Sequence, residues 1–183
     1  MLDKEQILKN KEVFLELNTK YKIFTKELLD FLGENLFLSP ATTNLDMFGC
    51  YPGGLMQHMI NSCKHSITLN DMLPENLRIN KTTIIKCSFI THIGKVFLYV
   101  ENKNEWAKKT LGKIYEFNND LIIMKGNHRS VYYANRYGIE LTENEYNAII
   151  NQDNENNYNE DILTFLLKKG IEMAILIEKN GNK

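Results

Sequence analysis

Apolar side chains recur along most of the chain at the spacing of an amphipathic α-helix. A hydrophobic residue every three or four positions gives a helix one face that can be buried against the rest of the protein. This pattern predicts seven helices, at residues 7–17, 21–32, 54–72, 82–93, 127–137, 143–151 and from Asp161 onward. The body of the protein is therefore expected to be mainly α.

Several residues mark where these helices begin and end. Gly33 follows the second apolar run and is expected to cap it at the C-terminus. Thr142 and Glu145 form a capping box, in which each side chain accepts a hydrogen bond from the other residue's backbone amide. Asp161 is expected to cap the last helix. Residues 34–52 and the polar, asparagine-rich run 151–160 are predicted as loops.

The segment between the fourth and fifth predicted helices has a different character. Residues 96–100 and 113–117 are rich in β-branched and aromatic side chains, and Asn118-Asn119-Asp120 is typical of a turn. We predict a small β-hairpin inserted at about residues 96–124. Helices within residues 1–33 are expected to pack on a helical body spanning residues 34–179, and the whole chain to form one structural domain.

Composition narrows the classes of function. Hydrophobic residues make up 43% and charged residues 25% of the 183 positions, as in globular proteins with a buried core. The formal net charge is −1, which disfavours strong non-specific binding to nucleic acid. The first residues lack an apolar signal core and no segment is apolar enough to span a membrane, so we expect neither export nor a membrane span. Three cysteines without paired spacing favour a reducing compartment. We expect a cytoplasmic protein.

Two motifs then give the chain a family resemblance. Residues 53–58 read GGLMQH, and residues 88–95 read SFITHIGK about thirty positions later. Together they resemble the motifs "GGLLEH" and "ALLHDIGK" of the HD-domain superfamily of metal-dependent phosphohydrolases. Segments 126–131, 138–142 and 166–170 resemble further motifs of a phage and bacterial branch, so the resemblance spans roughly residues 35–178.

The resemblance implies an HD-domain-like helical bundle with a metal site at its centre. Histidine and aspartate side chains from three motifs surround one divalent ion in that family, and some members hold a second ion. Such ions neutralise phosphate oxygens and lower the pKa of bound water, so that hydroxide forms at neutral pH.

At the ligand positions themselves this sequence departs from the family pattern. His58 keeps its position, but Thr91 stands where the family has histidine and His92 stands where it has aspartate. Ile171 occupies the position of the last aspartate, and Gln152 falls where the related branch has another histidine. At three of these four changed positions the expected ligand is thus replaced by a hydroxyl, an amide or an alkyl chain.

A shift by one residue does not restore the family site. His92, Asp153 and Glu172 each follow a lost ligand, but one residue along a helix is a rotation of about 100°. We therefore expect no cofactor. As an alternative, His58, His92 and His128 remain a candidate set for a single divalent metal (Zn, Mn, Fe or Ni).

Three cations are candidate ligands for a phosphate group. Lys95 follows the glycine of the second motif, whereas Lys125 and Arg129 lie at the start of a predicted helix, whose free backbone amides attract anions. The implied partner is a phosphate-bearing small molecule or a protein, and an oligomer is compatible with the sequence.

Three functional hypotheses follow from these observations. In the preferred one the chain is a degenerate HD-domain-like protein that has lost phosphohydrolase activity and acts as a binding or regulatory module. The first alternative is an active metal-dependent phosphohydrolase, with an altered histidine-rich site, that acts on nucleotides or nucleic-acid phosphodiesters. The second alternative is a structural subunit of a viral or mobile-element assembly, with which the phage-like motifs are compatible; the protein would then lie in the host cytoplasm.

Overall fold

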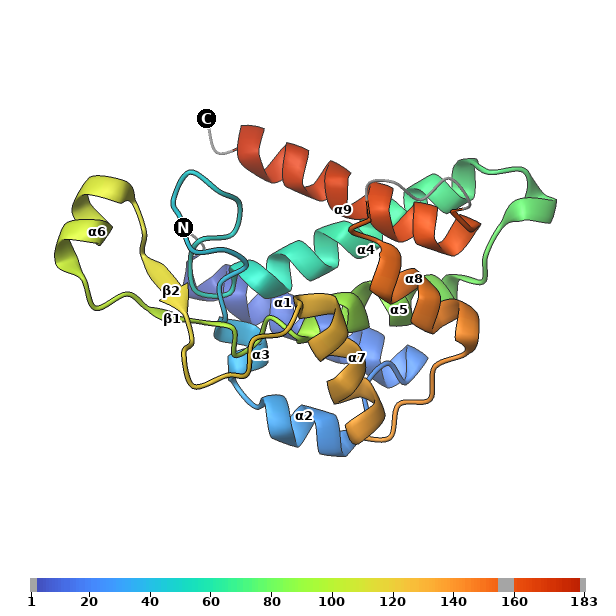
Figure 1. Ribbon diagram of the computed structural model, residues 1–183. Coiled ribbons are helices and arrows are strands. Elements are labelled where there is room, and N and C mark those ends of the chain that lie inside the picture. Colours follow the sequence, from blue (N-terminus) through green and yellow to red (C-terminus); the bar gives the residue numbers. More distant parts are fainter. Residues whose placement is uncertain (1–2, 155–159, 182–183) are drawn as a thin grey trace.

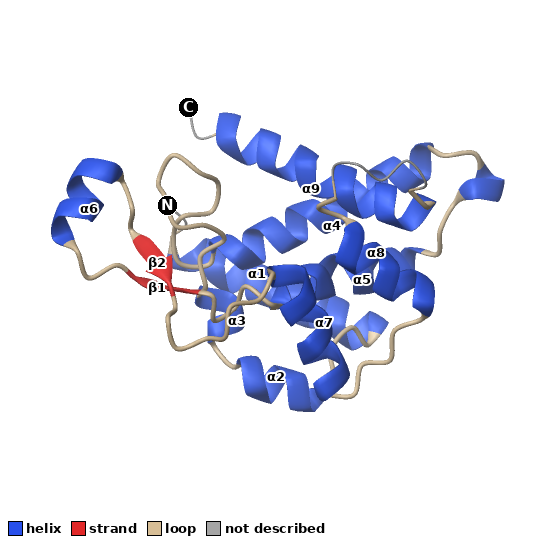
Figure 2. Ribbon diagram, in the orientation of Figure 1, coloured by secondary structure: helices blue, strands red, loops and turns tan. Residues whose placement is uncertain are grey.

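The computed structural model describes residues 3–154 and 160–181. Within these residues the protein is mainly helical, with one small antiparallel sheet (Figures 1 and 2), which confirms the fold class expected from the sequence. The helices, in chain order, are α1 (Lys4–Tyr21), α2 (Lys26–Leu32), α3 (Asn35–Leu38), α4 (Gly54–Met72), α5 (Lys81–Ile93), α6 (Glu105–Leu111), α7 (Gly126–Arg136), α8 (Glu143–Asn151) and α9 (Ile162–Asn180). A short 3-10 helix, η1, covers Glu75–Leu77, and the strands are β1 (Tyr99–Glu101) and β2 (Tyr115–Phe117).

Helices α4, α5 and α9 form the centre of the molecule, with α9 lying along α4 (Figure 1). Their inward faces carry fully buried apolar side chains such as Leu55, Ile90 and Leu166. Helices α7 and α8 pack against α5, and α1 packs against both α4 and α5. The two family-like motifs therefore lie on two of the three central helices, α4 and α5.

A glycine allows α4 and α9 to approach closely. A Cβ placed on Gly170 would lie only 2.1 Å from Ser66 Oγ and 2.8 Å from the carbonyl oxygen of Ser62. The Ser66 hydroxyl is fully buried here and lies 3.0 Å from the carbonyl oxygens of both Ser62 and Leu166, which can accept from it. The crossing depends on the small size of residue 170 and on a hydrogen bond between the helices.

The N-terminal helices differ from the sequence-based expectation in where they divide. The second apolar run was predicted from Tyr21, but Tyr21 is the last residue of α1, and the chain turns through Lys22, which has a φ of 51°. Helix α2 begins only after Thr25, whose side chain accepts from the amide of Leu28. Phe14 of α1 reaches the core, where its ring centroid lies 5.3 Å from that of Phe89.

The β-hairpin forms as predicted, but it contains a helix that the sequence pattern did not reveal. Strands β1 and β2 pair with Val100 opposite Glu116, and the chain between them folds into α6. Asn104 caps α6 by accepting from the amide of Ala107, and Gly112 ends it at a φ of 62°. This β-hairpin arm, residues 99–117, projects from the helical body (Figure 1).

Predicted helix ends are confirmed at three places. Gly33 is the C-cap of α2, the Thr142–Glu145 capping box starts α8, and Asp161 caps α9. Part of the predicted loop at 151–160 lies outside the described residues. The loop predicted at 34–52 contains the one-turn helix α3. No helix among the described residues is both long and apolar enough to cross a membrane.

Candidate functional site

Two of the predicted site residues, His58 and His92, meet in the core. His58 lies on α4 and His92 on α5, and their ring centroids are 5.0 Å apart with the planes at 69°. Both residues are almost wholly inaccessible, at 0% and 2% exposure. The ring of Phe48 packs on the ring of His58, with their centroids 4.5 Å apart.

Both ring nitrogens of His58 have neighbours. Its Nδ1 lies 2.9 Å from Oε2 of Glu178, and its Nε2 lies 3.5 Å from the hydroxyl of Ser62. The other carboxylate oxygen of Glu178 accepts from the side-chain amide of Asn61 at 2.7 Å. An N–H on Nδ1 that donates to the carboxylate fixes the orientation of the ring.

Glu178 was not among the residues singled out from the sequence. It lies two helical turns beyond Ile171, the position that the family resemblance assigned to the last carboxylate. Two turns bring a residue back to nearly the same face of a helix, because seven residues span close to a whole number of turns. A search along that face for the missing acid would have found it.

Burial and neighbouring charges act on the pKa of both histidines. Burial lowers the pKa of His58, while the hydrogen bond and charge of Glu178 oppose that effect. Burial, with smaller contributions from His58 and Lys95, lowers the pKa of His92 well below the ordinary histidine value. Its Nε2 is buried and has no hydrogen-bond partner among the described residues. The two rings therefore form a neutral pair at neutral pH.

The residues that replace the family ligands are engaged elsewhere or lack donor atoms. Thr91 is buried, and its hydroxyl donates to the carbonyl oxygen of Cys87 at 2.7 Å, within its own helix. Ile171 is half-buried and carries no heteroatom. Gln152 is the half-buried C-cap of α8.

The shifted carboxylates do not join the histidine pair either. Asp153 is exposed and accepts from the side-chain amide of Asn127 at 3.1 Å. Glu172 is exposed and pairs with Lys169 at 2.7 Å. His128, the third histidine of the candidate metal set, is exposed on α7. Across residues 3–154 and 160–181, no group of three or more His, Cys, Asp or Glu side chains is placed to hold a metal ion.

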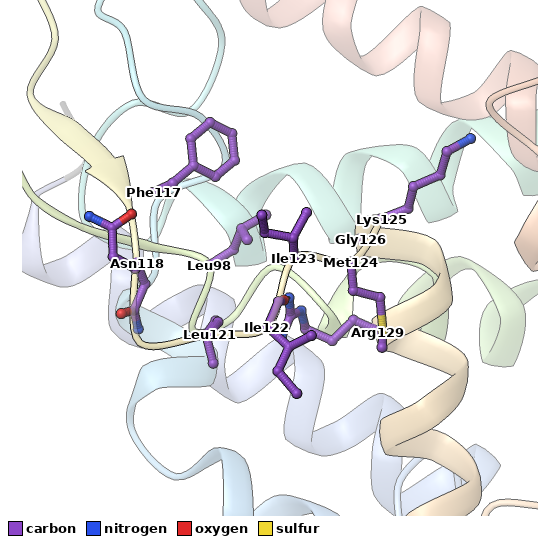
Figure 3. Close-up of a pocket in the computed structure, with 11 residues that line it drawn as sticks. Leu98, Phe117, Asn118, Leu121, Ile122, Ile123, Met124, Lys125, Gly126 and Arg129 are labelled. Atoms are coloured by element: carbon purple, nitrogen blue, oxygen red, sulfur yellow. The ribbon is translucent and has the colours of Figure 1, made fainter.

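The three predicted phosphate ligands lie around the N-terminus of α7. The stem of Lys95 approaches Gly126, since a Cβ built on that glycine would lie 3.6 Å from Lys95 Cγ. Burial lowers the pKa of Lys95, and the charge of Asp153 opposes that effect. Lys125 is exposed, and its side chain points away from Arg129 (Figure 3). Arg129 is only 5% exposed, and its Nη2 donates to the carbonyl oxygen of Ile122 at 2.6 Å.

Beside Arg129 lies a cavity of about 520 Å³, which we call the α7 pocket (Figure 3). Apolar side chains, two asparagines and the start of α7 surround it, and its lining residues are Leu98, Phe117, Asn118, Asn119, Leu121, Ile122, Ile123, Met124, Lys125, Gly126 and Arg129. The volume falls in the range of roughly 300–1,000 Å³ that is usual for small-molecule sites.

Comparisons with protein families, with curated proteins and with solved structures found no match to this chain.

Proposed function

We propose that this protein is a non-catalytic, HD-domain-like binding or regulatory module. A single observation carries the proposal: the histidine pair, where the two family-like motifs meet, is a closed and neutral core contact. His58 and His92 are 0% and 2% exposed, and their surroundings hold Phe48 and Ser62 where a hydrolase would need an open path for its substrate.

The chemistry of phosphoester hydrolysis gives further support. Such a reaction needs a nucleophilic hydroxide, and groups that neutralise the phosphate oxygens as negative charge develops. Here Thr91 offers only a hydroxyl that its own helix already uses, and Ile171 offers no donor atom. The carboxylate nearest to the pair, Glu178, is held by His58 and Asn61.

The exposed apolar surface of the β-hairpin arm favours a second candidate, a structural subunit of a larger assembly. Trp106 and Phe117 are each 62% exposed on this projecting element. Large apolar side chains in contact with water commonly mark protein–protein interfaces. Light scattering of the purified chain at several concentrations tests this candidate, which requires a stable oligomer.

Metal content and turnover test the proposed function. Purified protein would be incubated with Mn²⁺, Fe²⁺, Ni²⁺ or Zn²⁺, dialysed, analysed for bound metal by mass spectrometry, and assayed with a chromogenic phosphodiester. We expect no stoichiometric metal and no turnover. We also expect His92→Ala to lower the melting temperature by several degrees, because it empties space in the core.

A matched control is His65→Ala, which removes a half-buried histidine from the same helix as His58. It should leave the melting temperature almost unchanged. The proposal fails if the wild-type protein retains stoichiometric metal that His58→Ala loses. It also fails if His92→Ala abolishes a measured turnover while the melting temperature stays the same.

A further inference from the structure

Arg129 is a buried cation for which the α7 pocket supplies no counter-charge. The residue is only 5% exposed, yet its guanidinium donates to a neutral carbonyl oxygen, that of Ile122. Its Nε is buried without a hydrogen-bond partner among the described residues. A guanidinium keeps its charge when it is buried, so an unpaired one is costly unless an anion approaches it.

The walls around Arg129 do not provide that anion. The residues that line the α7 pocket are apolar, amide-bearing or basic, and no carboxylate is among them. Asp153 lies nearby, because it accepts from the side chain of Asn127, but it is exposed and is not part of the lining. The electrostatics of the cavity therefore favour a negatively charged group from outside the chain.

The first turn of α7 can contribute to holding such a group. The amides of Gly126 and Asn127 have no acceptor within the helix, because the first N–H groups of an α-helix have no carbonyl one turn before them. The amide of His128, the next residue, donates to the side-chain oxygen of Asn127. Lys125, the N-cap residue, makes no capping hydrogen bond with its side chain. Partial positive charge at the helix start and the Arg129 guanidinium thus favour an anion at the same end of the cavity.

The rest of the cavity has a different chemistry. Phe117 and Ile122 line it and are 62% and 80% exposed, and Met124 is 39% exposed. Ile122 and Met124 lie close to Arg129 in Figure 3. Covering apolar surface of this kind with a hydrophobic group lowers the free energy, because water is released from it.

We propose that the α7 pocket binds a small amphipathic anion, a carboxylate or phosphate group attached to an apolar body. The anionic oxygens accept hydrogen bonds from Arg129 and from the first turn of α7, while the apolar body covers Leu98, Phe117 and Ile122. This inference rests on the proposed function, because it names the class of ligand that the binding module recognises.

Calorimetric titration of the full chain tests the inference with four probes: decanoate, decyl phosphate, decanol and inorganic phosphate. Decanoate or decyl phosphate should bind at least tenfold more tightly than either decanol or inorganic phosphate. The better of the two anions identifies the headgroup. The inference is overturned if neither amphipathic anion binds, or if decanol or inorganic phosphate binds as tightly.

Two variants separate the contributions of charge and apolar surface. Arg129→Met keeps an unbranched side chain of similar volume but removes the charge, and it should weaken binding of the anion at least tenfold without lowering the melting temperature. Ile122→Asn changes a side chain that is 80% exposed, so it should leave folding unaffected and weaken binding several-fold. Arg136→Met on the same helix and Ile177→Asn on α9 are matched controls at exposed positions and should bind as the wild type does.

Equal weakening by Arg129→Met and Arg136→Met would overturn the inference, because it would show a general charge effect. Unchanged binding in Ile122→Asn would overturn the assigned place of the apolar body. The proposed function, in contrast, fails on bound metal and turnover, which these titrations do not measure, so the two failures are distinguishable.

Discussion

The histidine pair and the α7 pocket place polar chemistry in opposite surroundings. His58 and His92 carry the residue types of a catalytic centre, but they are neutral, closed in and, for His58, hydrogen-bonded at both ring nitrogens. Arg129 lies at an open cavity, keeps a charge and lacks a counter-ion among the residues that line it. Residue types that are typical of catalysis do not make a site when they are closed in the core. A charge without a counter-ion beside an accessible cavity is the better indication of where a ligand binds.

The largest expected effect comes from removing the ring of His58. His58→Ala leaves a cavity in the core and takes one partner from the carboxylate of Glu178, so we expect a loss of about 3–5 kcal/mol in the free energy of unfolding. Urea denaturation measures this loss. A loss of only about 0.5 kcal/mol, which is typical of surface substitutions, would contradict the description of the pair as a core contact.

A smaller loss is expected at Gly170, where α4 and α9 approach closely. Gly170→Ala would place a methyl group 2.1 Å from Ser66 Oγ, and overpacking of this kind costs about 1–3 kcal/mol. Gly126→Ala is a matched control, because its methyl group would meet only Lys95 atoms at 3.6 Å and beyond. If the two variants have the same stability in urea, the close approach of α4 and α9 is not what limits residue 170.

Acid should destabilise the protein through the buried histidine pair, His58 and His92. The folded-state pKa values of His58 and His92 lie below 6.5, so the unfolded chain binds more protons as pH falls below that value. The contribution of the two neutral histidines to the free energy of unfolding is therefore fully present above about pH 6.5. It decreases as the pH falls below that value, by up to about 1.4 kcal/mol per pH unit for each histidine. Denaturation curves between pH 7.5 and 5 measure the slope.

His92→Leu provides the control for this pH dependence. It removes one of the two buried titrating groups and should flatten the slope below pH 6.5. If the slope is the same in the variant and the wild type, His92 does not contribute to it.

The smallest effect is expected on the β-hairpin arm. Trp106 is 62% exposed on α6, so Trp106→Ser should change the free energy of unfolding by less than about 0.5 kcal/mol. A loss above about 1 kcal/mol would show that the arm, like the histidine pair, makes contacts that stabilise the fold.

Local patterns in the sequence were sufficient to predict most of the helices and several of their ends. The capping box of Thr142 and Glu145 and the cap at Asp161 involve residues only three positions apart, so their hydrogen bonds follow from the sequence itself. Likewise, the apolar spacing along residues 54–72 and 82–93 predicted the two helices that carry the histidine pair. The helix α6 was missed because its Asn104 cap and few apolar residues resemble a polar loop.

Only the tertiary structure decided what those helices place together. Glu178 reaches His58 across 120 residues of chain, and no local spacing predicts such a contact. The burial of Arg129 depends on the course of residues 117–125 over the start of α7, which periodicity does not determine. Hydrogen bonds over three or four residues are set by neighbouring side chains, whereas burial and charge compensation depend on every element that packs nearby.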